Sequence, residues 1–219
     1  MLTPPPTLRA LATALALLLS PYLETAAQSP TRADTAFTFA VFGVGYGVTQ
    51  FGEGLEARAE AGGFETSGGA VASLAVFRKF RRLPHVALGL RYKNLGASPA
   101  RGDDGAEMFF NYWTTSLAAR AYPFDRRAVG GVFVQGEFVF ATQFTQKYRN
   151  VAQQEYDHQF AIGSGFTGVL GYAYPLPGRR IALELGLEFD YAARQGEVTG
   201  RGEVDFRNTN VGVMGRLRI

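Results

Sequence analysis

The stretch RRIALELGLEFDYAARQ, Arg179 to Gln195, decides the class of fold. Within it, from Ile181 to Tyr191, bulky apolar residues alternate strictly with small or acidic ones. Side chains of a β-strand switch faces with a period of two, so this pattern predicts a strand with one apolar face. The other face carries Glu184, Glu188 and Asp190. The alternation alone does not say which of the two faces lies inside the protein.

The composition excludes several classes of protein. The chain has 219 residues, of which 19% are charged and 13% aromatic, with 27 glycines and no cysteine. This mixture is too apolar and too aromatic for a disordered chain. The formal net charge is +3, and the Lys and Arg residues are scattered along the chain. Because they form no basic stripe with interleaved aromatic residues, no nucleic acid is expected as a partner.

The N-terminus has the features of an export signal. Residues 1–27 place one positive charge, Arg9, before the apolar run LATALALLLS and the small residues TAA. This order is typical of a secretory signal peptide, with Ala27 as the expected last residue before cleavage. Residues 28–35 then form a polar leader, expected in the periplasm, and residues 36–219 form the β domain. Without cysteines, an exported chain must be stabilised by its own hydrogen bonds and packing, or by lipid.

Eight predicted strands fill the β domain. They cover residues 36–48, 70–80, 85–95, 108–122, 131–148, 159–174, 180–195 and 203–219. The second, fourth and sixth connections (81–84, 124–130 and 175–178) are tight, and the others are long and polar or rich in glycine. This alternation predicts that all long loops lie at one end of an antiparallel structure. The facing of the first two strands stays open, and a bulge is expected in the last strand near Val204 and Phe206.

Two architectures accommodate these strands. A soluble barrel or sandwich turns its apolar faces inward, whereas a transmembrane barrel turns them toward lipid. The polar faces are rich in Gly, Ala, Ser and Thr, as a crowded eight-strand interior requires, and they carry charges of both signs that can pair. Eleven tilted residues from Ile181 to Tyr191 span roughly 25 Å, the height of an outer-membrane apolar band. Aromatic residues, among them Tyr122, Phe124 and Tyr174, gather near the strand ends, as in interfacial girdles. These features predict an all-β, eight-stranded antiparallel transmembrane up-and-down β-barrel.

The same reasoning assigns residues to the two faces. The predicted interior charge network consists of Arg91, Arg120, Glu137, Glu184, Glu188, Asp190 and Arg216, and Arg78, Lys93, Arg218 and Gln143 are expected on the same polar faces. The predicted lipid-facing residues are Leu88, Leu90, Trp113, Leu117, Phe138, Phe140, Phe166, Leu170, Leu183, Leu185, Leu187 and Phe189.

The last strand carries a family resemblance. It ends in NVGVMGRLRI, with Val211, Val213, Leu217 and the terminal Ile219 on one face. This ending resembles the C-terminal assembly signal of bacterial outer-membrane barrels, which usually ends in Phe. With the signal peptide and the eight-strand layout, the whole β domain resembles the small OmpA/OmpX-type barrels, the outer-membrane β-barrel domain family. The resemblance implies a monomer in the outer membrane of a Gram-negative bacterium, in contact with lipid and lipopolysaccharide and inserted by the barrel-assembly machinery through its last strand.

Three motifs could indicate chemistry, and each lacks its required context. GSGFTG at 163–168 matches the dinucleotide pattern G-x-G-x-x-G, but a strand continues where a helix should begin. His158 follows an aspartate at a loop rim, but Ser164 is expected on the lipid side, so no catalytic set is implied. The acidic loop at 96–107 lacks the spacing of a calcium loop. We therefore expect no catalytic residue, no metal site and no cofactor.

The expected function is a structural or surface-interaction role in the outer membrane, with a side-chain-filled interior and four long extracellular loops. The sequence does not identify the partners of these loops. A narrow porin-like pathway for small solutes remains the main alternative. A lipid-A-modifying enzyme and a soluble periplasmic ligand-binding barrel are less favoured.

Overall fold

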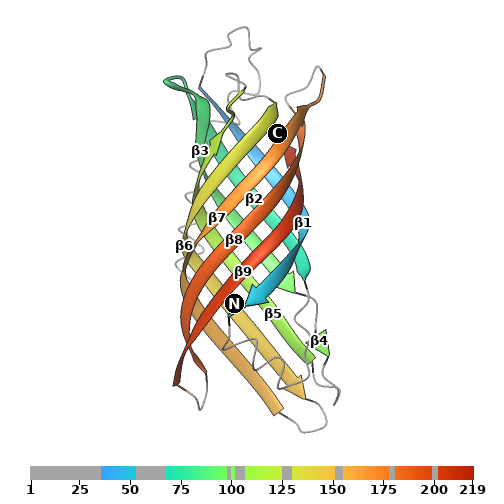
Figure 1. The fold of residues 1–219 in the computed structure, drawn as a ribbon, viewed down its shortest axis with the longest axis vertical. Coiled ribbons are helices and arrows are strands. Elements are labelled where there is room, and N and C mark those ends of the chain that lie inside the picture. Colours follow the sequence, from blue (N-terminus) through green and yellow to red (C-terminus); the bar gives the residue numbers. More distant parts are fainter. Residues whose placement is uncertain are drawn as a thin grey trace, which may run out of the picture.

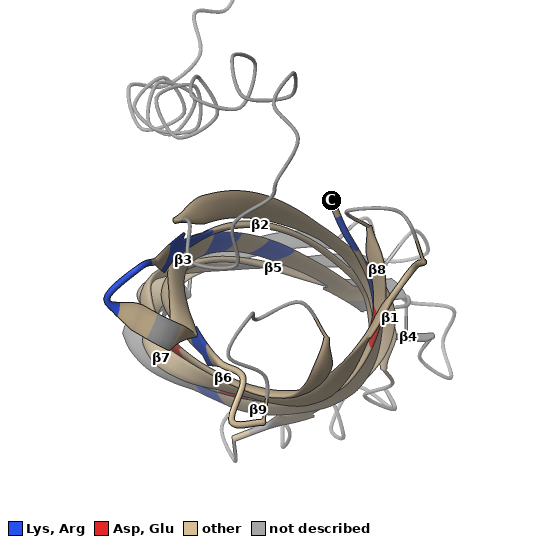
Figure 2. Ribbon diagram, turned by 90° about the horizontal axis from the view of Figure 1, so that it is seen from above, with Lys and Arg blue, Asp and Glu red and all other residues tan. Residues whose placement is uncertain are grey.

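Antiparallel pairing joins eight long strands into a closed ring (Figures 1 and 2). The computed structural model describes residues 36–52, 68–97, 100–101, 107–124, 130–150, 155–177, 181–198 and 202–219. Its strands are β1 (Phe37–Phe51), β2 (Gly69–Phe80), β3 (Leu83–Ala97), β4 (Ala100–Arg101), β5 (Glu107–Ala121), β6 (Gly131–Asn150), β7 (Glu155–Pro175), β8 (Ala182–Val198) and β9 (Gly202–Arg218). Apart from the two-residue β4, which pairs only with β5, each strand pairs with its sequence neighbours, and β9 pairs with β1. The predicted eight-stranded antiparallel up-and-down barrel is confirmed.

The predicted signal peptide (1–27) and polar leader (28–35) lie outside the described residues. In the part of the chain that the structure describes, no helix is long and apolar enough to cross a membrane.

The barrel has two different ends. At one of them, here called the turn end, lie the start of β1, the end of β9 and three short connections at 81–82, 122–130 and 176–181. The terminal Ile219 closes this end, because its amide donates to the Ala40 carbonyl at 2.9 Å and its carbonyl accepts from the Ala40 amide at 3.0 Å. The remaining connections leave from the opposite end, here called the loop end.

Some strands extend beyond their predicted limits toward the loop end. β6 continues to Asn150 and β7 begins at Glu155, and these two residues lie opposite each other. Backbone pairing thus continues into polar residues, where no apolar alternation marks the strand. The pairing of β8 with β9 runs in one register from Ala182 to Val198, so the expected bulge in the last strand is absent from it. The side chains of Val204 and Phe206 lie outside the described set.

The structure answers the open question of how β1 and β2 face. Phe42, Val44, Tyr46 and Val48 of β1 point outward and are exposed, and the glycines between them point inward. In β2, Arg78 is exposed on the outside and Lys79 is buried inside, so the prediction for Arg78 was wrong. Apolar residues occupy both faces of β2 at this point, and the alternation therefore gives no guide to its facing.

A bulge in β6 overturns a second assignment. Val139 lies opposite Gly165, and the next pair is Thr142 opposite Gly163, so residues 140–141 form a two-residue irregularity. Beyond it Thr142 is buried and Gln143 is exposed, whereas Gln143 was predicted on the polar face. Counting by twos fails across a bulge, because the extra residue shifts every later side chain to the other face.

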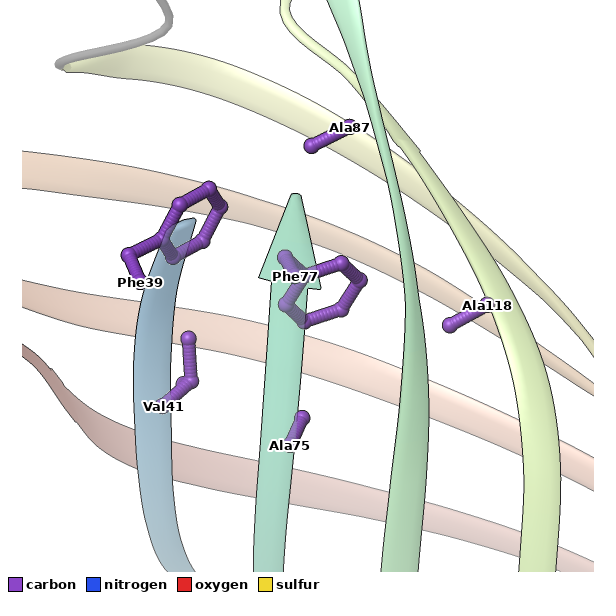
Figure 3. Close-up of a cluster of buried hydrophobic side chains, with 6 residues drawn as sticks. All are labelled: Phe39, Val41, Ala75, Phe77, Ala87 and Ala118. Atoms are coloured by element: carbon purple, nitrogen blue, oxygen red, sulfur yellow. The ribbon is translucent and has the colours of Figure 1, made fainter. Parts of the chain in front are cut away.

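The interior near the turn end contains two apolar clusters. Figure 3 shows one buried cluster, in which β1 contributes Phe39 and Val41, β2 contributes Ala75 and Phe77, and β3 and β5 add one alanine each. A second cluster consists of Tyr122, Phe133, Val169 and Ala173. Charged residues of the interior lie among these clusters on the same strands, and Lys79 and Arg218 are buried at the turn end itself.

Candidate functional site

Large apolar side chains cover the outside of the barrel. The predicted lipid-facing residues all lie on this surface: Leu88, Leu90, Trp113, Leu117, Phe138, Phe140, Phe166, Leu170, Leu183, Leu185, Leu187 and Phe189. Leu90 and Trp113 are partly buried and the others are exposed, up to 62% for Leu185. Soluble monomers rarely expose contiguous apolar patches of more than a few hundred Å², so this surface requires an apolar environment.

The residues of the predicted assembly signal share that outer surface. Val211, Val213, Leu217 and Ile219 point outward from β9 and are between 40% and 56% exposed. Because β9 pairs with both β8 and β1, this strand closes the ring. Recognition of these residues by the assembly machinery stays a prediction.

The predicted interior charges lie inside the ring. Arg91, Arg120, Glu137, Glu184, Glu188, Asp190 and Arg216 come from five different strands and are at most 6% exposed. Each sits on the inward parity of its strand. A charge buried this deeply requires paired partners, since an isolated one is strongly destabilising.

Glu188 of β8 is the centre of this network. Its carboxylate accepts from Arg91 Nη2 at 2.7 Å, from Lys93 Nζ at 2.8 Å and from Arg216 Nη2 at 2.8 Å. Arg91 and Lys93 come from β3 and Arg216 from β9, so one carboxylate links β8 to its neighbour β9 and to β3 on the opposite side of the ring. Hydrogen bonds between two ionised groups such as these are stronger than hydrogen bonds between neutral groups.

Two further carboxylates extend the network on either side of Glu188. Glu137 accepts from Arg91 Nη1 at 2.8 Å, and Asp190 accepts from Lys93 Nζ at 2.5 Å. The remaining acceptor positions of these two carboxylates are filled by Ser116, Gln135, Thr167 and Asn210. The result is a continuous chain of alternating charge across the barrel interior.

A second ion pair lies nearer the turn end. Both carboxylate oxygens of Glu184 accept from Arg120 Nη1 at 2.9 Å, and Gln135 accepts from Arg120 Nε at 2.7 Å. The guanidinium carbon of Arg120 lies 4.6 Å from the ring centroid of Phe77 and 4.3 Å from that of Phe133. Stacking on ring faces suits the planar guanidinium and adds cation–π attraction.

Tyr122 belongs to this inner group. It was predicted in an interfacial girdle, but it is fully buried, and its hydroxyl accepts from Arg120 at 3.3 Å and from Arg218 at 3.1 Å. Phe124 and Tyr174, predicted in the same girdle, are 84% and 56% exposed.

Sequence reasoning missed two buried cations, Lys79 and Arg194. Arg194 has the same parity along β8 as Glu188, and this signal could have identified it. Its Nε donates to Thr142 Oγ1 at 2.9 Å, and its guanidinium carbon lies 5.1 Å from the ring centroid of Tyr112. Among the described residues the buried cations outnumber the buried carboxylates, and several of these cations lie over aromatic rings. Ring faces thus add cation–π stabilisation to buried cations.

The motifs that could indicate chemistry do not assemble into a reactive centre in the described structure. GSGFTG lies wholly within β7, and Ser164 is exposed on the outer surface. His85 lies near the turn end with Nδ1 at 3.1 Å from the Tyr122 carbonyl oxygen. The side chain of His158 and most of the loop at 96–107 lie outside the described set. No group of three His, Asp or Glu side chains that could hold a metal ion occurs within the described ranges.

Comparison with known proteins gives a match at the level of structure. No protein-family model and no curated protein matches the sequence. The barrel is similar to the crystal structure of Ail, the attachment invasion locus protein of Yersinia pestis, with a TM-score of 0.51 and 9% identity, covering 83% of this chain and 99% of that chain. The chain has the fold of the small outer-membrane barrels. Neisserial surface protein A gives a TM-score of 0.48 at 12% identity, covering 83% of this chain and 97% of that chain.

Proposed function

We propose that this chain is an integral barrel of a bacterial outer membrane with a structural or surface-interaction role. The observation that carries the proposal is the inverted distribution of side chains, with apolar groups outside and paired charges inside. In water the apolar outer surface would drive aggregation, whereas in a membrane it contacts the hydrocarbon of the lipids. The same inversion argues against a soluble periplasmic barrel.

The filled interior favours this role over a porin-like pathway. The charged side chains around Glu188 are at most 6% exposed and bond to one another across the barrel. Eight strands enclose a space just wide enough for side chains to fill. In this proposal the loop end therefore carries the interaction with lipopolysaccharide or external partners, and the barrel acts as its monomeric anchor.

The first test is gel mobility of the mature chain refolded in detergent, with and without boiling. A closed barrel is expected to migrate differently before boiling and to show β-type circular dichroism. A chain that folds without detergent and shows no mobility shift would overturn the membrane assignment.

Orientation can be tested by cysteine labelling, because the chain has no cysteine of its own. Gln50→Cys lies near the loop end and Arg82→Cys at the turn end, and both positions are exposed. With an impermeant maleimide on intact cells, we expect labelling of the first variant only, and of both after the outer membrane is permeabilised. The reverse pattern would invert the proposed orientation.

A further inference from the structure

We propose that the turn end carries a binding surface for the headgroups of anionic phospholipids, formed by Arg78, Arg81 and Arg82. This inference rests on the proposed function, because it requires the barrel to span a membrane with its turn end at the periplasmic leaflet.

The three arginines form one exposed group. Arg78 points outward from β2, and Arg81 and Arg82 form the turn that joins β2 to β3. Every acidic side chain that the structure describes is buried inside the barrel, so none of these carboxylates can pair with the three arginines. Within the described part of the chain, the three outward cations therefore have no carboxylate partner and can bind an external anion.

Apolar side chains flank these arginines. Phe80 is 37% exposed, Leu83 45% and Leu88 44%, and Leu88 lies directly opposite Arg78 in the pairing of β2 with β3. The guanidinium groups thus lie where the apolar surface ends, at the level that lipid headgroups occupy. A guanidinium binds a phosphate through two parallel hydrogen bonds, so this position suits a phosphodiester.

The sequence repeats this feature at the same end. The other two short connections contain Arg126–Arg127 and Arg179–Arg180, which lie outside the described residues. The stretches that join strands at the loop end, residues 52–68, 98–106, 151–154 and 199–201, contain no such pair. Paired arginines are thus confined to the connections of one end.

The surroundings of the arginines select a lipid over a soluble polyanion. A ligand that matches both the arginines and the apolar side chains beside them must have two parts. It must present a negative charge to the guanidinium groups and hydrocarbon to Phe80, Leu83 and Leu88. An anionic phospholipid has both parts in this order, whereas a soluble polyanion offers no apolar part. Each arginine near an anionic surface is expected to strengthen binding about fivefold.

The test compares lipid binding to folded protein in detergent, measured by native mass spectrometry with phosphatidylglycerol and with phosphatidylcholine. We expect the wild type to prefer phosphatidylglycerol, and the triple variant Arg78→Gln/Arg81→Gln/Arg82→Gln to lose about 100-fold of that affinity with its phosphatidylcholine binding unchanged. Arg207→Gln is the matched control, because Arg207 is exposed near the loop end, and it should keep the preference.

Equal binding of the two lipids by folded wild type would overturn the inference, and so would an unchanged preference in the triple variant. A preference abolished by Arg207→Gln would do the same, because it would indicate a general charge effect. The heat-dependent gel shift of each sample separates these outcomes from failure of the proposed function, in which the wild type shows no shift. The wild-type comparison between the two lipids stands even if the triple variant does not fold.

Discussion

Replacing Glu188 by Gln removes the carboxylate that three buried cations share. Arg91, Lys93 and Arg216 all donate to it at 2.7–2.8 Å, and all four residues are at most 5% exposed. A glutamine has nearly the same shape but carries no charge. The variant therefore tests the electrostatic contribution of the network with little change in packing.

The expected cost follows from what each cation retains. Arg91 keeps Glu137 at 2.8 Å and Lys93 keeps Asp190 at 2.5 Å. Arg216 forms an ion pair with Glu188 at 2.8 Å and has no other in the described structure. Removing one partner of a buried pair costs about 3–5 kcal/mol because the other charge stays buried, so Glu188→Gln should lower the free energy of unfolding by that amount.

The assay is urea unfolding in phosphatidylcholine vesicles, followed by the fluorescence of Trp113, the only tryptophan of the chain. Glu137→Gln is the matched control, since Arg91, its one cation partner among the described residues, also pairs with Glu188. It should cost about 1–3 kcal/mol. Adding Arg216→Met to Glu188→Gln should restore part of the loss, because it removes the cation left without a carboxylate.

Two results would refute this reasoning. A cost below about 1 kcal/mol for Glu188→Gln would mean that water reaches the cations and replaces the carboxylate. Strictly additive costs in the double variant would mean that Glu188 and Arg216 do not interact. The first result would indicate a hydrated interior, and the argument against a permeation pathway would fail with it.

Further predictions concern the outer surface, the strand contacts and permeation. Leu187→Arg, at the middle of the exposed apolar run of β8, should cost ~2–4 kcal/mol in the same titration, and Leu183→Arg near the turn end ~0–1 kcal/mol. Equal costs would contradict the assigned depths. Gly165→Ala should cost about 1–3 kcal/mol, because its Cβ would lie 2.2 Å from the Tyr191 carbonyl oxygen. Gly168→Ala meets nothing within 4 Å and should leave the unfolding midpoint unchanged, so equal effects of the two alanines would contradict the packing of β7 on β8. In planar bilayers the wild type should show no stepwise conductance, and steady unitary currents would support the permeation alternative.

The sequence allowed the outer surface and the acidic interior residues to be predicted where the alternation is strict. In β8, five apolar residues share one face and three acids share the other, so the two faces can be assigned in only one consistent way. The structure places Glu184, Glu188 and Asp190 inside. The prediction failed where both faces of a strand are apolar. Near the turn end the interior is filled by Phe39 and Phe77, so inward and outward positions have the same residue types.

The partners within the interior could not be predicted. Arg91 and Glu188 are separated by 97 positions and meet only because the ring closes. The bulge in β6 could not be predicted from the sequence either. No proline marks its position, and a glutamine such as Gln143 is compatible with either face of the strand. Cation–ring contacts such as Arg120 with Phe133 depend on the tilt of the strands, which alternation does not specify.

The two surfaces of the barrel constrain the sequence differently. Lipid accepts any apolar side chain, so Leu185→Val on the outside should be nearly neutral. The interior of the barrel does not tolerate such single exchanges. Exchanging Arg91 with Glu137 would preserve that pair but would place a glutamate beside Glu188, where Arg91 now donates at 2.7 Å, and the exchange should therefore fail in the gel-shift assay. A change inside the barrel must satisfy several partners at once, whereas a change outside must only remain apolar.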